Sequence, residues 1–352
     1  MINRYSMLRR SRGLTLVELM VAMLLSLLLA AGAFTIFSGT KQASITQQDL
    51  ARMQENLRFT ITEMINRISI AGYMGCARSM IDGNTNITST VAVNDTPTAS
   101  WMPDFTLPIS GTDGAGGAPD TLTLVYADAE YPIRVAAQAG QSAPLSVWRD
   151  KNYEKHLDNF NVGNGSVMVV GDCERSAVFR LTNSLPSGAA AAAAAASAPV
   201  AVASMQHSAT GNTSAGIEYV FGNNKPAWMR KLEAVRFFLA TKTVGGKTIS
   251  SLMMRKIGQK RASAEELIEG VEDFQVQFGI DEEFPDHDGS ADRYVDWDAT
   301  LPLRRIASVR VTLRINGGRP VGNANGQADQ DTDVLRDITF TVKLRNQVGE
   351  FL

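Results

Sequence analysis

The stretch Gly13-Leu14-Thr15-Leu16-Val17-Glu18 decides how this chain is organised. A short leader with four arginines precedes it, and the apolar run from Leu14 to Phe37 contains Glu18 as its only charged residue. A carboxylate in a membrane-length apolar helix costs on the order of 2.5–3.5 kcal/mol at the helix centre and less near an end. Glu18 therefore needs a partner, and cutting the chain after Gly13 would supply one by making Leu14 a free amine.

This segment resembles the class III signal of type IV pilins and of type II secretion pseudopilins. In that family a membrane peptidase with aspartate chemistry cuts on the cytoplasmic side after a glycine and N-methylates the new terminus. The resemblance implies cleavage between Gly13 and Leu14, N-methylation of Leu14, and a role for Glu18 in docking the subunit into a fibre. The family usually has Phe as its first mature residue, whereas this chain has Leu14, which keeps the terminus apolar.

Two other interpretations of the N-terminus stay open. Ala31-Gly32-Ala33 offers the A-x-A pattern of a secretory signal peptide, although the apolar region is longer than the usual 7–15 residues and holds a glutamate. The second interpretation is a plain signal anchor, because about 20 apolar residues span a bilayer. Arginines before the run and none directly after it predict a cytoplasmic N-terminus, an inner-membrane span and a periplasmic C-terminal region.

The composition allows a membrane helix followed by a soluble region with its own core. The chain has 352 residues, of which 44% are hydrophobic, and a formal net charge of −2. The leader holds four arginines and no acidic residue, so the mature chain would carry about −6. Nothing in this balance indicates direct nucleic-acid binding, which needs a basic patch.

The two cysteines, Cys76 and Cys173, would both reach the periplasm. We expect a disulfide between them because an export compartment oxidises accessible pairs. The bond would close a loop of roughly 100 residues and could contribute up to about 4–5 kcal/mol in the chain-entropy model. Two buried free thiols are the alternative, because the sequence does not show that the two Cα atoms come within bridging distance.

The stem is predicted to be one helix from about Leu14 to Ala71, with a transmembrane or fibre-core part (14–37) and an amphipathic part (38–71). No proline occurs before Pro97, and Gly72 is a natural helix stop. The amphipathic part carries apolar residues at a spacing of three and four, which predicts one face packed on a sheet. These residues are Leu50, Met53, Leu57, Ile61, Met64, Ile65 and Ile68.

The head is predicted to be α+β, with the helix packed on antiparallel sheet and two enlarged lobes. We expect a first β-rich lobe (72–186), irregular up to about residue 118 apart from one short strand near Ser89–Val93. An alanine-rich flexible insertion (187–216) with a solvated His207 should follow. The C-terminal lobe (217–352) should be antiparallel, with a short helix over Ala264–Glu269. The predicted strands are rich in β-branched and aromatic residues. They are Leu122–Tyr126, Ile133–Ala136, Leu145–Trp148, Val167–Val170, Ala177–Leu181, Val235–Ala240, Ser251–Lys256, Val271–Phe278, Ile306–Ile315 and Ile338–Leu344.

The C-terminal pattern resembles PilW-type minor pilins and, more distantly, the J-type minor pseudopilin of type II secretion. The stretches that carry this resemblance are Leu267–Val276, Arg304–Ile315 and Thr339–Asn346, together with the turn Gly72–Cys76. The resemblance does not cover the alanine-rich insertion or residues 77–120. It implies a minor pilin with a pilin-like fold.

No enzymatic motif stands out, and we expect neither catalysis nor a cofactor. None of the three histidines forms a pair with metal-ligand spacing, and neither cysteine lies in a CxxC motif. Asp286, Asp288 and Asp292 place oxygen ligands in one short acidic loop, as calcium loops do, but without the EF-hand glycine and glutamate. A solvated acidic loop is the simpler interpretation.

The sequence therefore predicts a minor pilin of the type IV pilus, located first in the inner membrane and then in the fibre at the cell surface. It would prime pilus assembly at or near the tip and support twitching motility, adhesion or DNA uptake. Its expected partners are the prepilin peptidase, other minor pilins, the major pilin and the inner-membrane assembly platform. The alternatives are a J-like minor pseudopilin of type II secretion and a signal-anchored periplasmic enzyme or binding protein.

Overall fold

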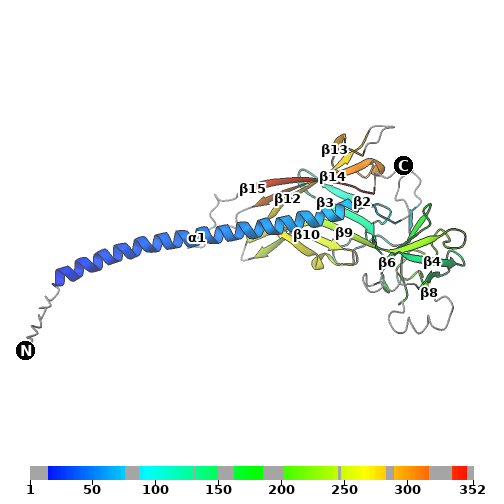
Figure 1. Cartoon of the computed structure of the whole chain (residues 1–352), viewed down its shortest axis with the longest axis horizontal. Helices are drawn as coiled ribbons and strands as arrows, with labels where there is room; N and C mark the ends of the chain where they lie inside the picture. The colour runs from blue at the N-terminus through cyan, green and yellow to red at the C-terminus, as the bar shows by residue number, and fades with distance from the viewer. Residues whose placement is uncertain are drawn as a thin grey trace, which may run out of the picture. The chain divides into compact units, whose positions relative to one another are not determined.

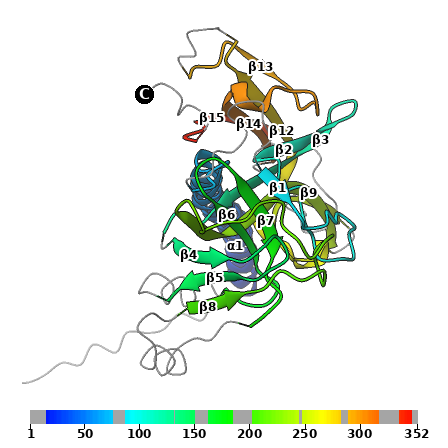
Figure 2. The same ribbon diagram turned by 90° about the vertical axis from the view of Figure 1, so that its right-hand side faces the viewer.

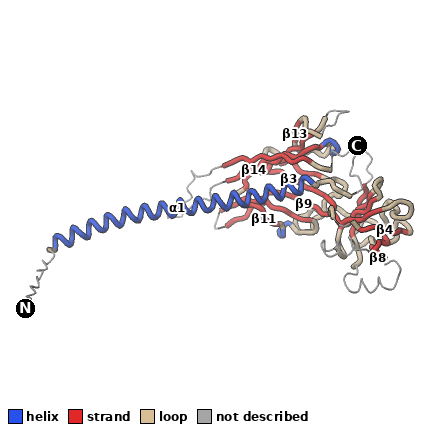
Figure 3. Tube along the Cα trace, viewed as in Figure 1, coloured by secondary structure: helices blue, strands red, loops and turns tan. Residues whose placement is uncertain are grey.

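The computed structural model describes residues 15–75, 87–130, 132–149, 162–184, 202–244, 247–282, 289–316 and 335–346. Its first element is one continuous helix, α1 (Leu16–Ser69), which confirms the predicted stem helix (Figure 1). The chain divides into two compact units, residues 1–54 and 55–352. The first consists of helix where it is described, and the second is rich in strands (Figure 3).

The last four turns of α1 bury one face, as the spacing of the apolar residues predicts. Thr60, Met64 and Ile68 are fully buried, whereas Phe59 on the opposite side is 62% exposed. Residues four apart lie on one helix face, so the three buried side chains form a single stripe. The Thr60 hydroxyl lies 2.8 Å from the Asn56 backbone oxygen and 3.3 Å from the Leu267 backbone oxygen, which ties the stripe to the head.

A large sheet is organised around β9 (Ala227–Val244), a strand of 18 residues. The N-terminal half of β9 pairs with β6 and β4, and its C-terminal half pairs with β3 and β10. Figure 2 shows β4, β5 and β8 following one another at one end of this sheet. The other strands of the sheet are β1 (Ile87–Ser89), β2 (Ile109–Gly114), β3 (Ala118–Ala127), β4 (Ile133–Gln138), β5 (Leu145–Trp148), β6 (Val167–Gly171), β7 (Ser176–Arg180), β8 (Val202–Met205), β10 (Lys247–Lys256) and β11 (Glu265–Glu269).

A second sheet of four strands has the order β13-β12-β14-β15, and all its pairs are antiparallel. Its strands are β12 (Val271–Ile280), β13 (Arg293–Val295), β14 (Ile306–Asn316) and β15 (Leu335–Lys343). Along β14, Val309, Val311 and Leu313 are fully buried and alternate with more exposed residues. This alternation confirms the predicted antiparallel sheet with one buried face.

The predicted division into two lobes is not shown. Residues 55–352 form one compact unit, and β9 from the C-terminal part pairs with β3, β4 and β6 from the first part. A strand of 18 residues is long enough to pair with strands from both parts of the chain, since each residue adds about 3.3 Å to its length. The strand predicted from the sequence covers only Val235–Ala240 of β9, which is too short to link the two parts.

The predicted flexible insertion (187–216) differs from the structure in its second half. Residues 185–201 lie outside the described residues, but β8 pairs with β5 over four residues and belongs to the large sheet. His207, expected to be solvated, is 3% exposed and lies against Phe179 with ring centroids 5.3 Å apart. Hydrogen bonding to the sheet orders this part of the segment despite its low sequence complexity.

Two further predictions of secondary structure were wrong. Ala264–Glu269 is not a helix, because Glu265–Glu269 form β11 against β10 after a single 3₁₀ turn at Arg261–Ser263. A helix of six residues is marginal without tertiary support, whereas pairing with β10 satisfies the backbone at once. The segment 72–118 contains two strands instead of the one predicted near Ser89–Val93: β1 ends at Ser89, and β2 was not predicted.

Candidate functional site

The start of α1 carries the residues on which the predicted assembly function depends. Gly13 and Leu14 lie outside the described residues, so cleavage and methylation stay predictions. The Thr15 hydroxyl accepts a 3.3 Å hydrogen bond from the backbone N–H of Glu18, and the Leu19 N–H donates to the Thr15 backbone oxygen at 3.1 Å. Thr15 is thus the N-cap of α1, and Glu18 is the acidic residue of its first turn.

This cap gives Glu18 a local role beside the predicted one. Thr15 and Glu18 have the T-x-x-E spacing of a capping box, and a carboxylate in the first turn complements the helix dipole. This spacing can be read directly from the sequence and marks the helix start, which was predicted one residue earlier at Leu14. The helix start is therefore encoded in residues that lie after the proposed cleavage point.

The apolar side chains of the N-terminal half of α1 are exposed. Leu16–Ile45 is long and apolar enough to cross a membrane, and none of its most apolar window is buried within the molecule. The hydroxyls of Ser26 and Thr35 donate to backbone oxygens three residues earlier, each at 2.8 Å. The few polar groups are thus satisfied inside the helix, as an apolar environment requires.

The other end of α1 is fixed to the head by backbone and side-chain hydrogen bonds. Gly72 adopts a φ of 79°, which suits glycine at a helix stop, and its N–H donates to Val125 of β3 at 2.9 Å. The Arg345 N–H donates to the Ser69 backbone oxygen at 3.1 Å, and the Asn346 side chain donates to the Ile70 backbone oxygen at 3.2 Å. Residues directly after β15 therefore satisfy backbone oxygens at the end of the helix.

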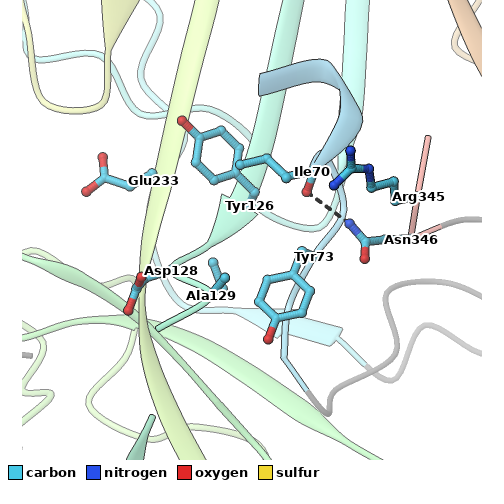
Figure 4. A pocket seen from close by; sticks show the side chains of 9 residues that line it. Ile70, Tyr73, Tyr126, Asp128, Ala129, Glu233, Arg345 and Asn346 are labelled. Atoms are coloured by element: carbon cyan, nitrogen blue, oxygen red, sulfur yellow. Dashed lines mark hydrogen bonds between the residues drawn. The ribbon is translucent and has the colours of Figure 1, made fainter. Parts of the chain in front are cut away.

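A pocket of about 260 Å³ lies at this junction, and Figure 4 shows Tyr73, Ala129 and Asn346 around it. Its lining combines two phenols, two carboxylates and one guanidinium, and it contains no histidine, cysteine or serine. The lining residues are Ile70, Tyr73, Tyr126, Ala127, Asp128, Ala129, Glu233, Arg345 and Asn346.

Two groups of the pocket have shifted pKa values. Burial raises the pKa of Asp128 to about 6, although the Glu130 N–H donates to its carboxylate at 3.0 Å and Arg230 lies nearby. Burial likewise raises the pKa of Tyr126 to about 12, although its hydroxyl accepts a hydrogen bond from Arg67 of α1. Arg67 is itself paired with Glu63 at 2.6 Å, so a charged network joins the stem to β3.

The calcium candidates are only partly described. Asp286 and Asp288 lie outside the described residues, and Asp292 accepts a 2.6 Å hydrogen bond from the backbone N–H of Glu282. Within the described residues, no group of three or more His, Cys, Asp or Glu side chains could hold a metal ion. The part of the acidic loop that is described uses Asp292 to fix the backbone, and calcium binding stays a prediction.

The cysteines are likewise partly described. Cys173 lies in the turn between β6 and β7 with a φ of 71°, and Cys76 lies outside the described residues. The preceding Gly75 lies so close to Arg230 of β9 that a Cβ there would be 2.8 Å from the guanidinium Nε. Arg230 is paired with Val169 of β6, four residues before Cys173. The chain thus reaches the neighbourhood of the β6–β7 hairpin just before Cys76.

Two family models match this chain, one at the start of the stem helix and one in the C-terminal part of the head. Residues 236–346 match the family model of type IV pilus-assembly protein W, and residues 8–34 match the prokaryotic N-terminal methylation motif. No curated protein and no solved structure gave a significant match. The first match begins in β9 and ends at Asn346, the residue that binds the end of α1. Together the matches confirm the predicted resemblance to PilW-type minor pilins and to proteins with the prokaryotic N-terminal methylation motif.

Proposed function

We propose that this protein primes assembly of a type IV pilus and occupies a position at or near its tip. One observation carries the proposal. The N-terminal methylation motif lies at the start of an exposed apolar helix, and the same chain carries a PilW domain. A motif for membrane processing, a helix that needs lipid or other helices, and a folded head are the three parts that a fibre subunit needs.

The proposed mechanism begins in the inner membrane. The leader arginines hold the N-terminus in the cytoplasm, and the exposed apolar half of α1 stores the subunit in the bilayer. The prepilin peptidase then cuts between Gly13 and Leu14 and methylates Leu14. Removal of four positive charges frees the helix to move out of the membrane and into a fibre, where neighbouring helices replace lipid.

Glu18 is the proposed docking residue. Its side chain is exposed in the first turn of α1, where it would meet the terminal amine of a neighbouring subunit. In a low-dielectric fibre core an unpaired carboxylate is costly, so this pairing would select correctly placed subunits. The Thr15 cap keeps Glu18 in the first helical turn and so supports this role.

The tip position is inferred from the size of the head. Residues 55–352 form one compact unit with two sheets, which is bulky for a subunit repeated along a thin filament. A single copy at the tip, in contact with other minor pilins and then the major pilin, avoids this crowding. Such a position would serve twitching motility, adhesion or DNA uptake. The assembly platform of the inner membrane would drive its extrusion.

A disulfide between Cys76 and Cys173 is proposed to tie the end of the stem to the β6–β7 hairpin. The approach of Gly75 to Arg230, beside β6, supports this pairing. The bond would protect the junction under the pulling forces that act on a fibre. Export to the periplasm would supply the oxidising environment.

A J-like minor pseudopilin of type II secretion is the alternative, because the N-terminal resemblance includes pseudopilins. The match to type IV pilus-assembly protein W favours the pilus. A signal-anchored periplasmic binding protein is a further alternative, which requires neither processing nor Glu18.

A deletion strain separates these functions. We expect loss of surface pili and of twitching with normal exoprotein secretion, restored by the wild-type chain but not by Glu18→Ala. Glu55→Ala is the matched control, because Glu55 is an exposed acid on the same helix and should restore piliation. Loss of secretion with normal piliation would favour the pseudopilin. Full restoration by Glu18→Ala would contradict assembly through this residue.

A further inference from the structure

Two arginines face each other across β9 and β10. Arg236 and Arg255 are direct partners in the antiparallel register, and the side chain of Arg255 is only 3% exposed. Like charges directly opposite each other destabilise a sheet, and a buried guanidinium is costly unless it is paired. These two arginines therefore need neighbouring groups that offset their repulsion and the burial of Arg255.

Trp101 contacts both of these charges. The guanidinium carbons of Arg236 and Arg255 lie 5.0 and 5.9 Å from its ring centroid, within the range of cation–π attraction. The indole is fully buried, and its N–H has no hydrogen-bond acceptor within the described residues.

A third arginine increases the local excess of positive charge. Arg261 stacks on Phe238 at 4.8 Å, on the strand that carries Arg236. Burial lowers the pKa of Arg255, Asp95 raises it, and the charges of Arg236 and Arg261 lower it further. These guanidinium groups are thus close enough to interact, and we call Asp95, Trp101, Arg236, Arg255 and Arg261 the arginine cluster.

Asp95 is the carboxylate of this cluster and satisfies only part of it. It accepts hydrogen bonds from Arg236 Nη1 at 2.6 Å, but its distance to Arg255 Nη1 is 3.9 Å, which is too long for a hydrogen bond. Arg255 also donates to the backbone oxygens of Gln259 and Ala99, each at 2.9 Å. These bonds explain how the loop is held to the sheet, but they leave three cationic groups facing one exposed carboxylate.

Two lysines on the neighbouring strands are paired and add no excess charge to this cluster. The neighbouring Lys256 is paired with Glu265 at 2.8 Å, and Lys242 is paired with Glu266 at 2.9 Å. Among the described residues, the cationic groups of this surface are the arginine cluster and the adjacent exposed Lys260, and the whole chain carries a net negative charge. Such a surface suits one or two carboxylates better than a nucleic-acid backbone, which needs a line of positive charges.

We propose that the arginine cluster is a docking site for an acidic segment of a partner subunit, whose carboxylate binds Arg261 and the accessible part of Arg236, while the buried Arg255 adds positive charge without direct contact. Guanidinium groups bind carboxylates through paired, charge-assisted hydrogen bonds, which gives the contact geometric selectivity. The site would accept an Asp or Glu side chain that displaces or joins Asp95. That the partner is a pilin subunit rests on the proposed function, whereas carboxylate binding does not.

Binding can be measured on the purified full-length protein in detergent micelles. The probes are a hexaglutamate peptide, a hexaglutamine peptide of equal length and a short DNA duplex, and the readout is isothermal titration calorimetry. We expect saturable binding of hexaglutamate only, weakened at least tenfold by Arg236→Gln and by raising the salt concentration. Arg261→Gln changes an exposed member of the cluster and should weaken binding without the risk of misfolding that Arg236→Gln carries.

Arg293→Gln is the matched control, because Arg293 is an exposed arginine on β13 that is paired with Glu282 at 2.5 Å. We expect the Arg293→Gln protein to bind hexaglutamate with the same affinity as the wild-type protein. Absence of hexaglutamate binding, equal binding by Arg261→Gln, or binding of the duplex alone would each overturn the proposal. The assay needs no pilus, so its result is independent of whether the protein assembles into a fibre.

Discussion

The side-chain amide of Asn346 donates a hydrogen bond to the backbone oxygen of Ile70 at 3.2 Å, joining the end of the C-terminal sheet to the end of the stem helix (Figure 4). The last backbone oxygens of a helix have no partner within the helix itself. The backbone oxygen of Ser69, the last residue of α1, likewise accepts a hydrogen bond from the backbone N–H of Arg345. The family match to protein W ends at this contact, so the matched domain includes the residue that holds the stem.

Replacing Asn346 by alanine should destabilise the head by about 1 kcal/mol, because a part-buried backbone oxygen loses its donor. Urea denaturation of the full chain in detergent, followed by the fluorescence of the head, measures this loss. Asn56→Ala is the control, since Asn56 is an exposed helical residue and alanine is a better helix former. Equal midpoints for Asn346→Ala and wild type would contradict a structural role for this contact.

Asp128 predicts a pH dependence of stability. Its pKa is raised to about 6 in the folded chain, above the ordinary value of an unfolded aspartate, so the folded state binds the proton more tightly. Protonation of Asp128 therefore stabilises the folded chain. This stabilisation is complete below about pH 4, the pKa of an unfolded aspartate, and is lost as the pH rises through the folded pKa of about 6. Asp128→Asn should raise stability at pH 7.5 by roughly 1–2 kcal/mol and change it little at pH 3.5.

The control for this substitution is Asp104→Asn. Asp104 is exposed and accepts a 2.9 Å hydrogen bond from the Thr106 N–H, as Asp128 does from Glu130, so both asparagines can keep the local turn. We expect no comparable gain at pH 7.5 for Asp104→Asn. Thermal unfolding at both pH values tests the difference, and an equal effect of the two substitutions would show that burial of Asp128 is not the cause.

His207 should be one of the most sensitive positions of residues 202–216. Its two ring nitrogens each lie 2.9 Å from a backbone oxygen, of Ala215 and of Ala143, and the side chain is buried. His207→Ala would remove these bonds and expose a cavity next to Phe179, which should cost about 2–4 kcal/mol. Chemical denaturation measures the loss. The exposed neighbour Gln206 provides the control substitution, Gln206→Ala, which should be close to neutral.

The proposed Cys76–Cys173 disulfide can be tested by mass. Protein isolated from the periplasmic face should not react with a thiol-alkylating reagent until it is reduced, because both cysteines of the chain would be in the bond. Loss of the bond through Cys173→Ser should lower stability by about 2–4 kcal/mol. Alkylation of both cysteines without reduction would contradict the pairing.

Much of the fold follows from local patterns in the sequence. The stem helix was predictable because apolar spacing, the absence of proline and Gly72 all agree. The strands around Val309 and Leu313 were predictable because their alternation has only one buried face. Residues of β11 were assigned to a helix because the stabilising partner, β10, is chosen by tertiary pairing and not by local preference.

The junction and the arginine cluster could not be derived from the sequence. Asn346 meets Ile70 across 276 positions of chain, and Arg255 reaches Ala99 across 156. Neither pair carries a local signal, because an asparagine and an arginine are ordinary surface residues until the fold brings their partners to them. His207 was misjudged for the same reason, since its alanine-rich surroundings say nothing about the carbonyl groups that enclose it.

The central claim is that the chain is cut after Gly13 and methylated at Leu14. The direct test is the intact mass and N-terminal sequence of protein extracted from membranes, with and without the prepilin peptidase. The account predicts a peptidase-dependent start at Leu14 with a mass increase of about 14 Da from one methyl group. A start at Met1 in both strains, or a start after Ala33, would contradict assembly into a fibre.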